Sequence, residues 1–278
     1  MISRRMFLSG GLAAALRAKA AAGLKIAVMD GVVGQSSKPE AVAVARRFGL
    51  AGLQVTLGRS PSNDRLLLED PGLQARFLAE SKQHQLPLVA TYIDMLHISC
   101  LKSDPRSRDW VMKGIGITRK LDAHILMTVF FGKCAVESPR ELDHVCGVFR
   151  ELAPEAEKAG VILGFENLLK AADNLRALER VNSRAFKIYY DVGNATNLVG
   201  VDAPAEIRQM GRDAICQLHF KDKGYLGEGK VNYPEVLKAL ADIGYTGYAT
   251  LETSAPSGSM EEDLRRNIDY LRGLIERV

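Results

Sequence analysis

Four side chains that can bind a metal ion or move protons lie at or near the ends of apolar segments. They are Glu166 in VILGFEN, Asp191 in FKIYYD, His219 in ICQLHFKD and Glu252 in GYATLE. Three carboxylates placed together repel one another and resist ionisation, and a divalent cation removes that conflict. Three carboxylates with one imidazole suit Mn²⁺, Mg²⁺ or Co²⁺, and the imidazole also admits Fe²⁺ or Zn²⁺. We therefore expect one divalent metal ion, with Mn²⁺ as the first candidate.

The elements that must position these residues alternate along the chain. Short apolar segments predict strands at 24–30, 52–58, 87–94, 124–131, 161–167, 186–191, 215–221 and 247–252. Amphipathic patterns predict helices at 38–48, 70–84, 104–122, 139–159, 172–182, 204–213, 232–243 and 259–277. Eight such units of about 30 residues fit an α/β fold, a closed (β/α)₈ TIM barrel, as a single domain over 23–278. A doubly wound dinucleotide-binding sheet is the weaker alternative, because no GxGxxG follows the first strand. We also expect Pro154 to end or kink the helix at 139–159, and Gly160 to stop it.

The barrel would bring the four side chains together, because its active sites gather at the C-terminal ends of the strands. Segment 215–221 shows the pattern best, since alternate side chains of a strand point to opposite faces. One face carries Cys216, Leu218 and Phe220, and the other carries Gln217, His219 and Lys221. We expect the first face to pack on helices. The second would place Gln217 deep in the barrel, His219 at the metal and Lys221 at the rim.

Several motifs resemble a known group of enzymes. GFEN, YYDVGN, LHFKD, LGEGKVNYPEVLKAL and ATLE are similar to motifs of the xylose-isomerase-like superfamily, which includes sugar phosphate isomerases/epimerases and ketose 3-epimerases. The resemblance covers nearly all of the chain after residue 22 and is strongest from Val161 to Glu252. It implies that Glu166, Asp191, His219 and Glu252 are the metal ligands. It also implies that Glu166 and Glu252 form the catalytic acid/base pair.

Five further side chains are candidates for binding substrate: His97, Asn167, Asn194, Lys221 and Glu228. Lys221 either stabilises a developing oxyanion or forms a salt bridge with Asp222 or Glu228. Asn167 and Asn194 either bind hydroxyl groups or cap turns. Glu228 lies between two glycines on the loop after residue 221, and His97 follows the third predicted strand.

Two positions depart from the ketose 3-epimerase pattern. Those enzymes often carry a histidine three residues after the metal-binding aspartate, where this chain has Asn194. Many relatives also carry a glutamate where the second strand ends here at Gly58. Both departures bear on the choice of substrate more than on the metal.

The expected function is that of a divalent-metal-dependent sugar isomerase/epimerase. It would abstract the proton α to the carbonyl of a keto-sugar and pass through an enediolate. One alternative is a lyase or hydrolase of 3-keto-glycosides, which would follow the same abstraction with β-elimination. Another is a sugar-binding barrel without catalysis. An enzyme like endonuclease IV is disfavoured, because only His219 and His97 are placed where its three-zinc cluster would need several histidines.

The N-terminal residues resemble a twin-arginine export signal. Ser3-Arg4-Arg5-Met6-Phe7-Leu8 precedes a short apolar run and then small residues, so residues 1–22 are expected to be a cleaved signal peptide and the protein to be periplasmic. The apolar run is too short to span a bilayer, and no membrane anchor is expected after cleavage.

The charge of the chain limits the classes of binding partner, and its cysteines bear on disulfide formation. Cleavage would remove four of the 37 basic residues and none of the 33 acidic ones, which leaves the two classes equal. A nucleic-acid partner is therefore not expected, and a small sugar is, with a homo-oligomer possible by analogy with relatives. The four cysteines show no CxxC spacing, so no disulfide framework is expected. Cys146 and Cys216 are predicted to pack in the core.

Overall fold

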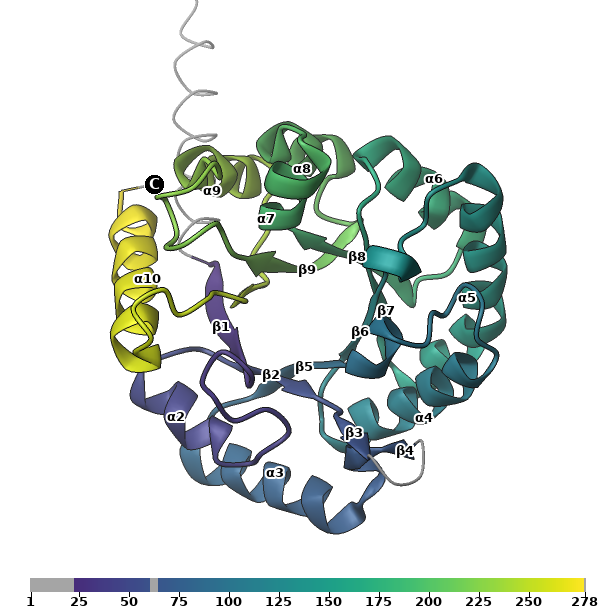
Figure 1. The fold of residues 1–278 in the computed structure, drawn as a ribbon, viewed down its shortest axis with the longest axis horizontal. Coiled ribbons are helices and arrows are strands. Elements are labelled where there is room, and N and C mark those ends of the chain that lie inside the picture. Colours follow the sequence, from purple (N-terminus) through teal and green to yellow (C-terminus); the bar gives the residue numbers. More distant parts are fainter. Residues whose placement is uncertain (1–22, 61–64, 278) are drawn as a thin grey trace, which may run out of the picture.

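A ring of eight parallel strands surrounded by helices makes up the computed structural model, which describes residues 23–60 and 65–277 (Figure 1). The barrel strands follow the order β1-β10-β9-β8-β7-β6-β5-β2 and close on themselves. They are β1 (Lys25–Met29), β2 (Leu53–Thr56), β5 (Leu88–Tyr92), β6 (Ile125–Val129), β7 (Ile162–Glu166), β8 (Phe186–Asp191), β9 (Ile215–Phe220) and β10 (Tyr248–Leu251). The predicted single-domain TIM barrel is confirmed. The predicted signal peptide lies outside the described residues.

Each barrel strand is followed by a helix on the outside of the ring (Figure 1). These helices are α2 (Ala41–Arg47), α3 (Pro71–His84), α4 (Arg106–Lys120), α5 (Pro139–Ala159), α6 (Ala171–Val181), α8 (Ala203–Met210), α9 (Tyr233–Asp242) and α10 (Met260–Ile275). Side-chain caps set the starts of α3, α5 and α8: Asp70, Ser138 and Asp202 each accept a backbone N–H of the first turn.

The outward faces of the strands build the core. Phe165 of β7 and Phe186 of β8 pack against Phe149 of α5, with ring centroids 5.5 and 4.5 Å from it. Phe220 of β9 packs in the same way on Tyr233 of α9, at 5.2 Å. The predicted outward face of β9 is therefore confirmed.

Helix α5 continues through Pro154, so of the two predicted effects, an end or a kink, the end is wrong. Proline removes one backbone hydrogen bond and crowds the preceding turn. Pro154 lies on the exposed side of α5, where the freed carbonyl can be hydrated, while Leu152, Ala153 and Ala156 bury the other side. The helix ends at Gly160, as predicted, with a φ of 69°.

The loops contain short elements that the sequence patterns did not predict. They are the hairpin β3 (Arg59–Ser60) and β4 (Arg65–Leu66), the 3₁₀ turns η1 (Leu67–Glu69), η2 (Asp94–His97) and η3 (Gly132–Cys134), and the helical turn α7 (Val192–Asn194), which continues into the π-helical η4 (Ala195–Val199). Among the described residues, no helix is both long and apolar enough to cross a membrane.

The cysteines are used differently from the prediction. Cys100, in the loop after β5, forms a disulfide with Cys134, in the loop after β6. The pairing spans 34 residues and depends on the barrel placing these two loops side by side, so their spacing in the chain gave no sign of it. Cys146 and Cys216 are free, and both pack with the hydrophobic core as expected.

Candidate metal centre

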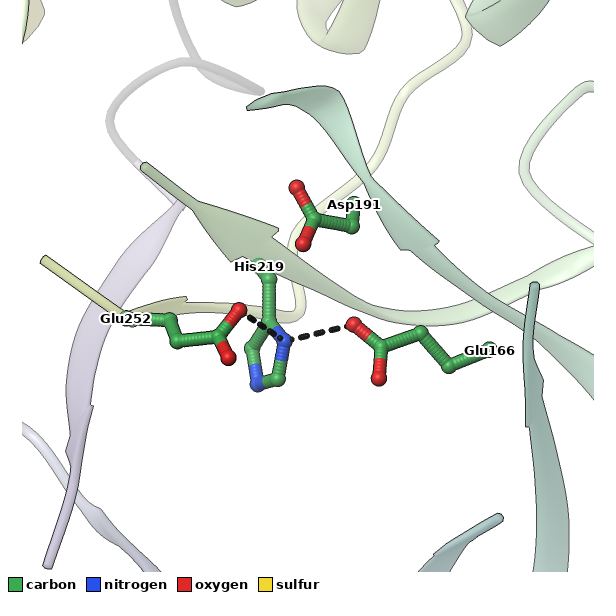
Figure 2. A group of neighbouring side chains, drawn as sticks. All are labelled: Glu166, Asp191, His219 and Glu252. Atoms are coloured by element: carbon green, nitrogen blue, oxygen red, sulfur yellow. Dashed lines mark hydrogen bonds and ion pairs between the residues drawn. The ribbon is translucent and has the colours of Figure 1, made fainter. Parts of the chain in front are cut away.

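The four predicted ligands converge at the C-terminal end of the barrel. One ligand atom from each of the four lies within 4.8 Å of the other three. Glu166 and Asp191 are the last residues of β7 and β8, and Glu252 directly follows β10. Figure 2 shows Glu166 and Glu252 on opposite sides of the His219 ring. Four consecutive strands thus deliver three carboxylates and an imidazole to one place.

The imidazole is the centre of this group. His219 Nδ1 lies 2.8 Å from Glu166 Oε1 and 3.2 Å from Glu252 Oε2. Register explains the approach to Asp191, because Asp191 and His219 are partners across β8 and β9. His219 is fully buried, whereas the Glu252 side chain keeps 32% of its surface exposed. Of His219 and Glu252, Glu252 is therefore the side chain that a solute can reach more directly.

A buried amide fixes the orientation of the ring. His219 Nε2 lies 2.8 Å from Gln54 Oε1, and this same oxygen accepts a hydrogen bond of 3.0 Å from the Tyr189 hydroxyl. Gln217, predicted to lie deeper than His219, donates to the Tyr189 hydroxyl and to Thr250. Gln54 Oε1 accepts a hydrogen bond from the Nε2 N–H, so Nδ1 is the ring atom that faces the carboxylates.

Lys221 adds a positive charge to the cluster. Its Nζ lies 2.8 Å from Asp191 Oδ2 and 2.7 Å from Glu252 Oε2. The alternative in which Lys221 pairs with Asp222 or Glu228 is therefore wrong. The difference arises because Lys221 directly follows β9 and points with His219 into the barrel, while Asp222 accepts backbone N–H groups of its own loop.

Burial and charge shift the proton affinities of the cluster in opposite directions. Burial raises the pKa of Asp191 to about 7, although the Lys221 ammonium opposes the rise. Burial would lower the pKa of His219, but the charges of Glu166 and Glu252 outweigh it and raise that pKa to about 10. Burial would raise the pKa of Glu252, yet His219 and Lys221 hold it well below its ordinary range. His219 is thus held as an imidazolium here, and its charge and that of Lys221 offset two of the three carboxylates.

A divalent cation fits this donor set. With His219 protonated, the imidazolium and Lys221 leave one of three carboxylate charges unbalanced. A divalent cation in place of the Nδ1 proton would balance all three. Nδ1 faces the Glu166 and Glu252 carboxylates, and the Nε2 N–H donates to Gln54 Oε1, as is usual for a metal-ligating histidine. Glu166, Asp191, His219 and Glu252 are the residues that could hold it.

The ends of β8 and β9 approach closely at Gly193. The Asp191 carboxylate accepts the backbone N–H of Asn194 at 2.9 Å, which starts the α7 turn directly after the ligand. A Cβ at position 193 would lie 2.6 Å from the Lys221 carbonyl oxygen. Only glycine therefore fits at position 193 of YYDVGN.

A cavity of about 190 Å³ opens above the cluster. Glu166, Glu252 and Lys221 line it, together with aromatic and aliphatic side chains. The complete lining is Tyr92, His97, Met127, Val129, Phe131, Glu166, Asn194, Leu198, Lys221 and Glu252. A pocket with apolar walls and a few polar groups in one place is typical of small-molecule sites.

Three of the five predicted substrate-binding residues line this cavity: His97, Asn194 and Lys221. Asn167 is not among the lining residues; its amide donates to Phe165 and Asn174 and accepts the N–H of Leu169, so it caps its own turn. Glu228 is also not in the lining. It is half-exposed and forms an ion pair with Arg266 of α10.

Sequence reasoning missed Gln54, Tyr92 and Phe131. Gln54 interrupts the apolar segment GLQVTLG in the same way that Gln217 interrupts ICQLHFKD, so its polarity was the available signal. Tyr92 and Phe131 end or follow their strands, but aromatic side chains at those positions look the same as core residues in a sequence.

The barrel and its cluster define a class of protein, and comparison with known proteins agrees with it. Residues 42–274 match the family described as "Xylose isomerase-like TIM barrel". The chain belongs to this family.

Individual relatives are more distant. A 2-epi-5-epi-valiolone 7-phosphate 2-epimerase from Actinoplanes sp. is 27% identical over 187 residues, which cover 66% of this chain and 67% of that protein. Among solved structures, D-psicose 3-epimerase, determined in the presence of D-fructose, superposes with a TM-score of 0.76 at 15% identity, over 90% of this chain and 99% of the other. L-ribulose 3-epimerase gives 0.74 at 18% identity, over 91% and 95%. At these identities the two structures show that the fold is shared.

Proposed function

We propose that this protein is a divalent-metal-dependent sugar isomerase or epimerase that acts on a keto-sugar. The observation that carries the proposal is the placement of two glutamates, Glu166 and Glu252, on opposite sides of His219 at the floor of a cavity (Figure 2). A sugar-binding barrel without catalysis has no need of two proton-transferring groups there. Several of the similar proteins are epimerases, which also supports an isomerase or epimerase function.

The metal ion is proposed to be bound by Glu166, Asp191, His219 and Glu252. When bound, a divalent cation supplies Lewis-acid polarisation of a carbonyl oxygen and a neighbouring hydroxyl. Mn²⁺ is the first candidate, and Mg²⁺, Co²⁺, Fe²⁺ or Zn²⁺ are compatible with the same oxygen and nitrogen donors.

The protons are moved by the two glutamates. One carboxylate abstracts the proton α to the carbonyl, and the other returns a proton from the opposite face, which inverts the carbon or moves the carbonyl. The Lys221 ammonium, 2.7 Å from Glu252 Oε2, is placed to stabilise the negative charge that develops on the enediolate oxygens. His97 and Asn194 line the cavity and would contact the sugar, Asn194 at a hydroxyl group.

Proton exchange tests the proposal directly. The chelator-stripped protein is supplied with Mn²⁺ in D₂O and incubated with D-fructose, D-allulose or L-ribulose, and deuterium at the α carbon is followed by NMR. We expect incorporation with at least one sugar. Glu252→Gln removes one proton carrier and should slow exchange by on the order of 10²–10⁴-fold.

Glu228→Gln is the matched control, because it changes the same group outside the cavity and should exchange as fast as the parent. Absence of exchange with every sugar, or an unimpaired Glu252→Gln, contradicts the proposal. NMR of the products also separates an epimer from a cleaved sugar; cleavage of a 3-keto-glycoside would identify the lyase alternative.

We further propose that the protein is exported. The arginine pair and apolar run of residues 1–22 support this, and so does the disulfide between Cys100 and Cys134, because disulfides persist in oxidising compartments. Fractionation of cells that express the full chain, with Arg4→Lys/Arg5→Lys as the comparison, tests it. Retention of the parent protein in the cytoplasm contradicts it.

A further inference from the structure

Two neighbouring loops form one side of the cavity and are covalently joined. The loop after β5 carries His97 and Cys100, and the loop after β6 carries Phe131 and Cys134. The disulfide brings the Cα atoms of the two cysteines to 4.9 Å. Both cysteines are buried and neither lines the cavity, so the cross-link lies behind the cavity surface.

Three rings form this side of the cavity, and we call them the aromatic wall: Tyr92, His97 and Phe131. The His97 and Phe131 rings stack with their centroids 6.0 Å apart and their planes 27° apart. Tyr92 meets His97 edge-on at 5.9 Å. Burial lowers the pKa of His97, which favours the neutral ring in this stack. The wall therefore offers a flat and mostly apolar surface beside the carboxylates.

The cross-link touches both loop residues of the wall. Cys134 Sγ lies 3.6 Å from the His97 carbonyl oxygen; since a disulfide sulfur carries no proton, this is a packing contact. The backbone N–H of Cys134 donates to the Phe131 carbonyl at 2.9 Å. Lys102 adds a second, non-covalent link by donating to the Ala135 carbonyl at 2.6 Å.

The backbone on either side lies outside the sheet, and its own hydrogen bonds are those of short turns. His97 ends a four-residue 3₁₀ turn, and Phe131 precedes Gly132, whose φ is 52°. Both residues lie beyond the last barrel pairs of β5 and β6. Segments without sheet or long-helix hydrogen bonds open locally at low free-energy cost. A covalent link between the two loops restricts that opening.

We propose that the Cys100–Cys134 disulfide is a positioning element for substrate specificity: it holds His97 and Phe131 stacked as a platform for an apolar C–H face of the sugar. The inference rests on the proposed function. The aromatic wall would orient the sugar without taking part in proton transfer, so its disruption raises KM and leaves kcat nearly unchanged.

The test uses Mn²⁺-loaded protein and the double variant Cys100→Ser/Cys134→Ser. The matched control is Cys146→Ser, which changes a buried free cysteine on α5. With the fastest sugar of the D₂O panel, we expect KM of the double variant to rise on the order of tenfold, because two wall side chains must then be ordered on binding. Its kcat should stay within about twofold, and Cys146→Ser should keep both constants.

Hydrogen exchange supplies a readout that needs no sugar. In the double variant we expect faster amide exchange in residues 94–104 and 131–136, and unchanged exchange around Asp191 and His219. The parent protein reduced with tris(2-carboxyethyl)phosphine gives the same comparison if the variant does not fold. Unchanged amide exchange in both loops overturns the inference. This result can be obtained even if no sugar of the panel reacts and the proposed function fails. Faster exchange with an unchanged KM in an active enzyme overturns it as well.

Discussion

His219 shows how one amide decides the chemistry of a ring. Gln54 Oε1 can accept a hydrogen bond and has no hydrogen to donate, so it keeps the hydrogen on Nε2 when the ring is neutral as well as when it is protonated. The Tyr189 hydroxyl holds the amide oxygen in place from the other side. The other ring nitrogen, Nδ1, faces the carboxylates of Glu166 and Glu252.

Replacement of Gln54 by Leu should therefore weaken metal binding. Without the acceptor, the His219 ring is free to rotate or to adopt the other tautomer, and we expect Mn²⁺ affinity to fall about 10–100-fold. Isothermal titration of the chelator-stripped protein measures it. Met127→Leu replaces the residue whose sulfur accepts a hydrogen bond from Gln54 Nε2, on the side of the amide away from His219. This variant should keep the Mn²⁺ affinity of the parent. Equal affinities for Gln54→Leu and the parent would refute the orienting role of the amide.

Asp30 makes stability depend on pH. It is fully buried, and it accepts hydrogen bonds from the Ser37 and Thr56 backbone and from the Thr56 hydroxyl. Burial nevertheless raises the pKa of Asp30 from 3.8 to about 6. The folded state therefore binds this proton more tightly than the unfolded state does. The free energy of unfolding then falls as pH rises from about 4 to about 6 and levels off above that.

We expect Asp30→Asn to lose this slope. Between pH 4 and pH 7 the parent should lose about 2 kcal/mol of unfolding free energy relative to Asp30→Asn. Urea denaturation of both proteins at the two pH values gives the difference, and groups that titrate in both proteins cancel. Parallel pH dependences would show that Asp30 ionises in the folded protein as it does in the unfolded chain.

At the scale of elements, the site depends on the short distance between the C-terminal ends of β8 and β9. Gly193→Ala would put a Cβ 2.5 Å from Lys221 Cγ and 2.6 Å from the Lys221 carbonyl oxygen. One of the two strand ends must then shift, and Asp191 or His219 with it. We expect a lower melting temperature and at least about tenfold weaker Mn²⁺ binding.

Gly116→Ala is the control for that substitution. Gly116 lies within α4 with nothing within 4 Å of an added Cβ, so alanine should stabilise the helix by about 0.5–1 kcal/mol and leave metal binding unchanged. Thermal unfolding with and without Mn²⁺ compares the two variants. A Gly193→Ala protein as stable and as tightly binding as the parent would mean that the strand ends are adaptable.

The elements also show what the sequence could predict. All eight strand segments and all eight large helices were found from their periodicity. The clustered residues Glu166, Asp191, His219 and Glu252 could be found because they are polar residues at or near the ends of apolar strands. The disulfide could not, because Cys100 and Cys134 come together only when β5 and β6 are neighbours. The ion pairs of Lys221 with Asp191 and Glu252 were missed for a related reason. The acids nearest to it in the chain are bound elsewhere, Asp222 by its own loop and Glu228 by Arg266.

At the scale of the whole molecule, the cluster connects four consecutive strands, β7 to β10. A ligand that binds only the folded barrel stabilises it by mass action, by about 2.7 kcal/mol at a concentration of 100 Kd. For a chain of this size we expect Mn²⁺ to raise the melting temperature of stripped protein by roughly 5–10 °C. Differential scanning calorimetry measures the shift, and chelator should reverse it.

Asp191→Asn should lose most of that shift, because it removes a carboxylate from the cluster. His84→Ala changes a histidine of α3 outside the cluster and should retain the full shift. An equal shift in the two variants would place the binding elsewhere on the molecule.

The cavity draws its two kinds of surface from different stretches of the chain. Its acidic floor comes from Glu166 at the end of β7 and Glu252 directly after β10, and its aromatic wall comes from β5 and the loops that follow β5 and β6. Those two loops are tied to each other by a covalent bond. For protein engineering the two loops form one exchangeable unit. Residues 93–104 and 130–136 could be replaced together with the matching loops of another barrel, disulfide included, while β7 to β10 remain unchanged.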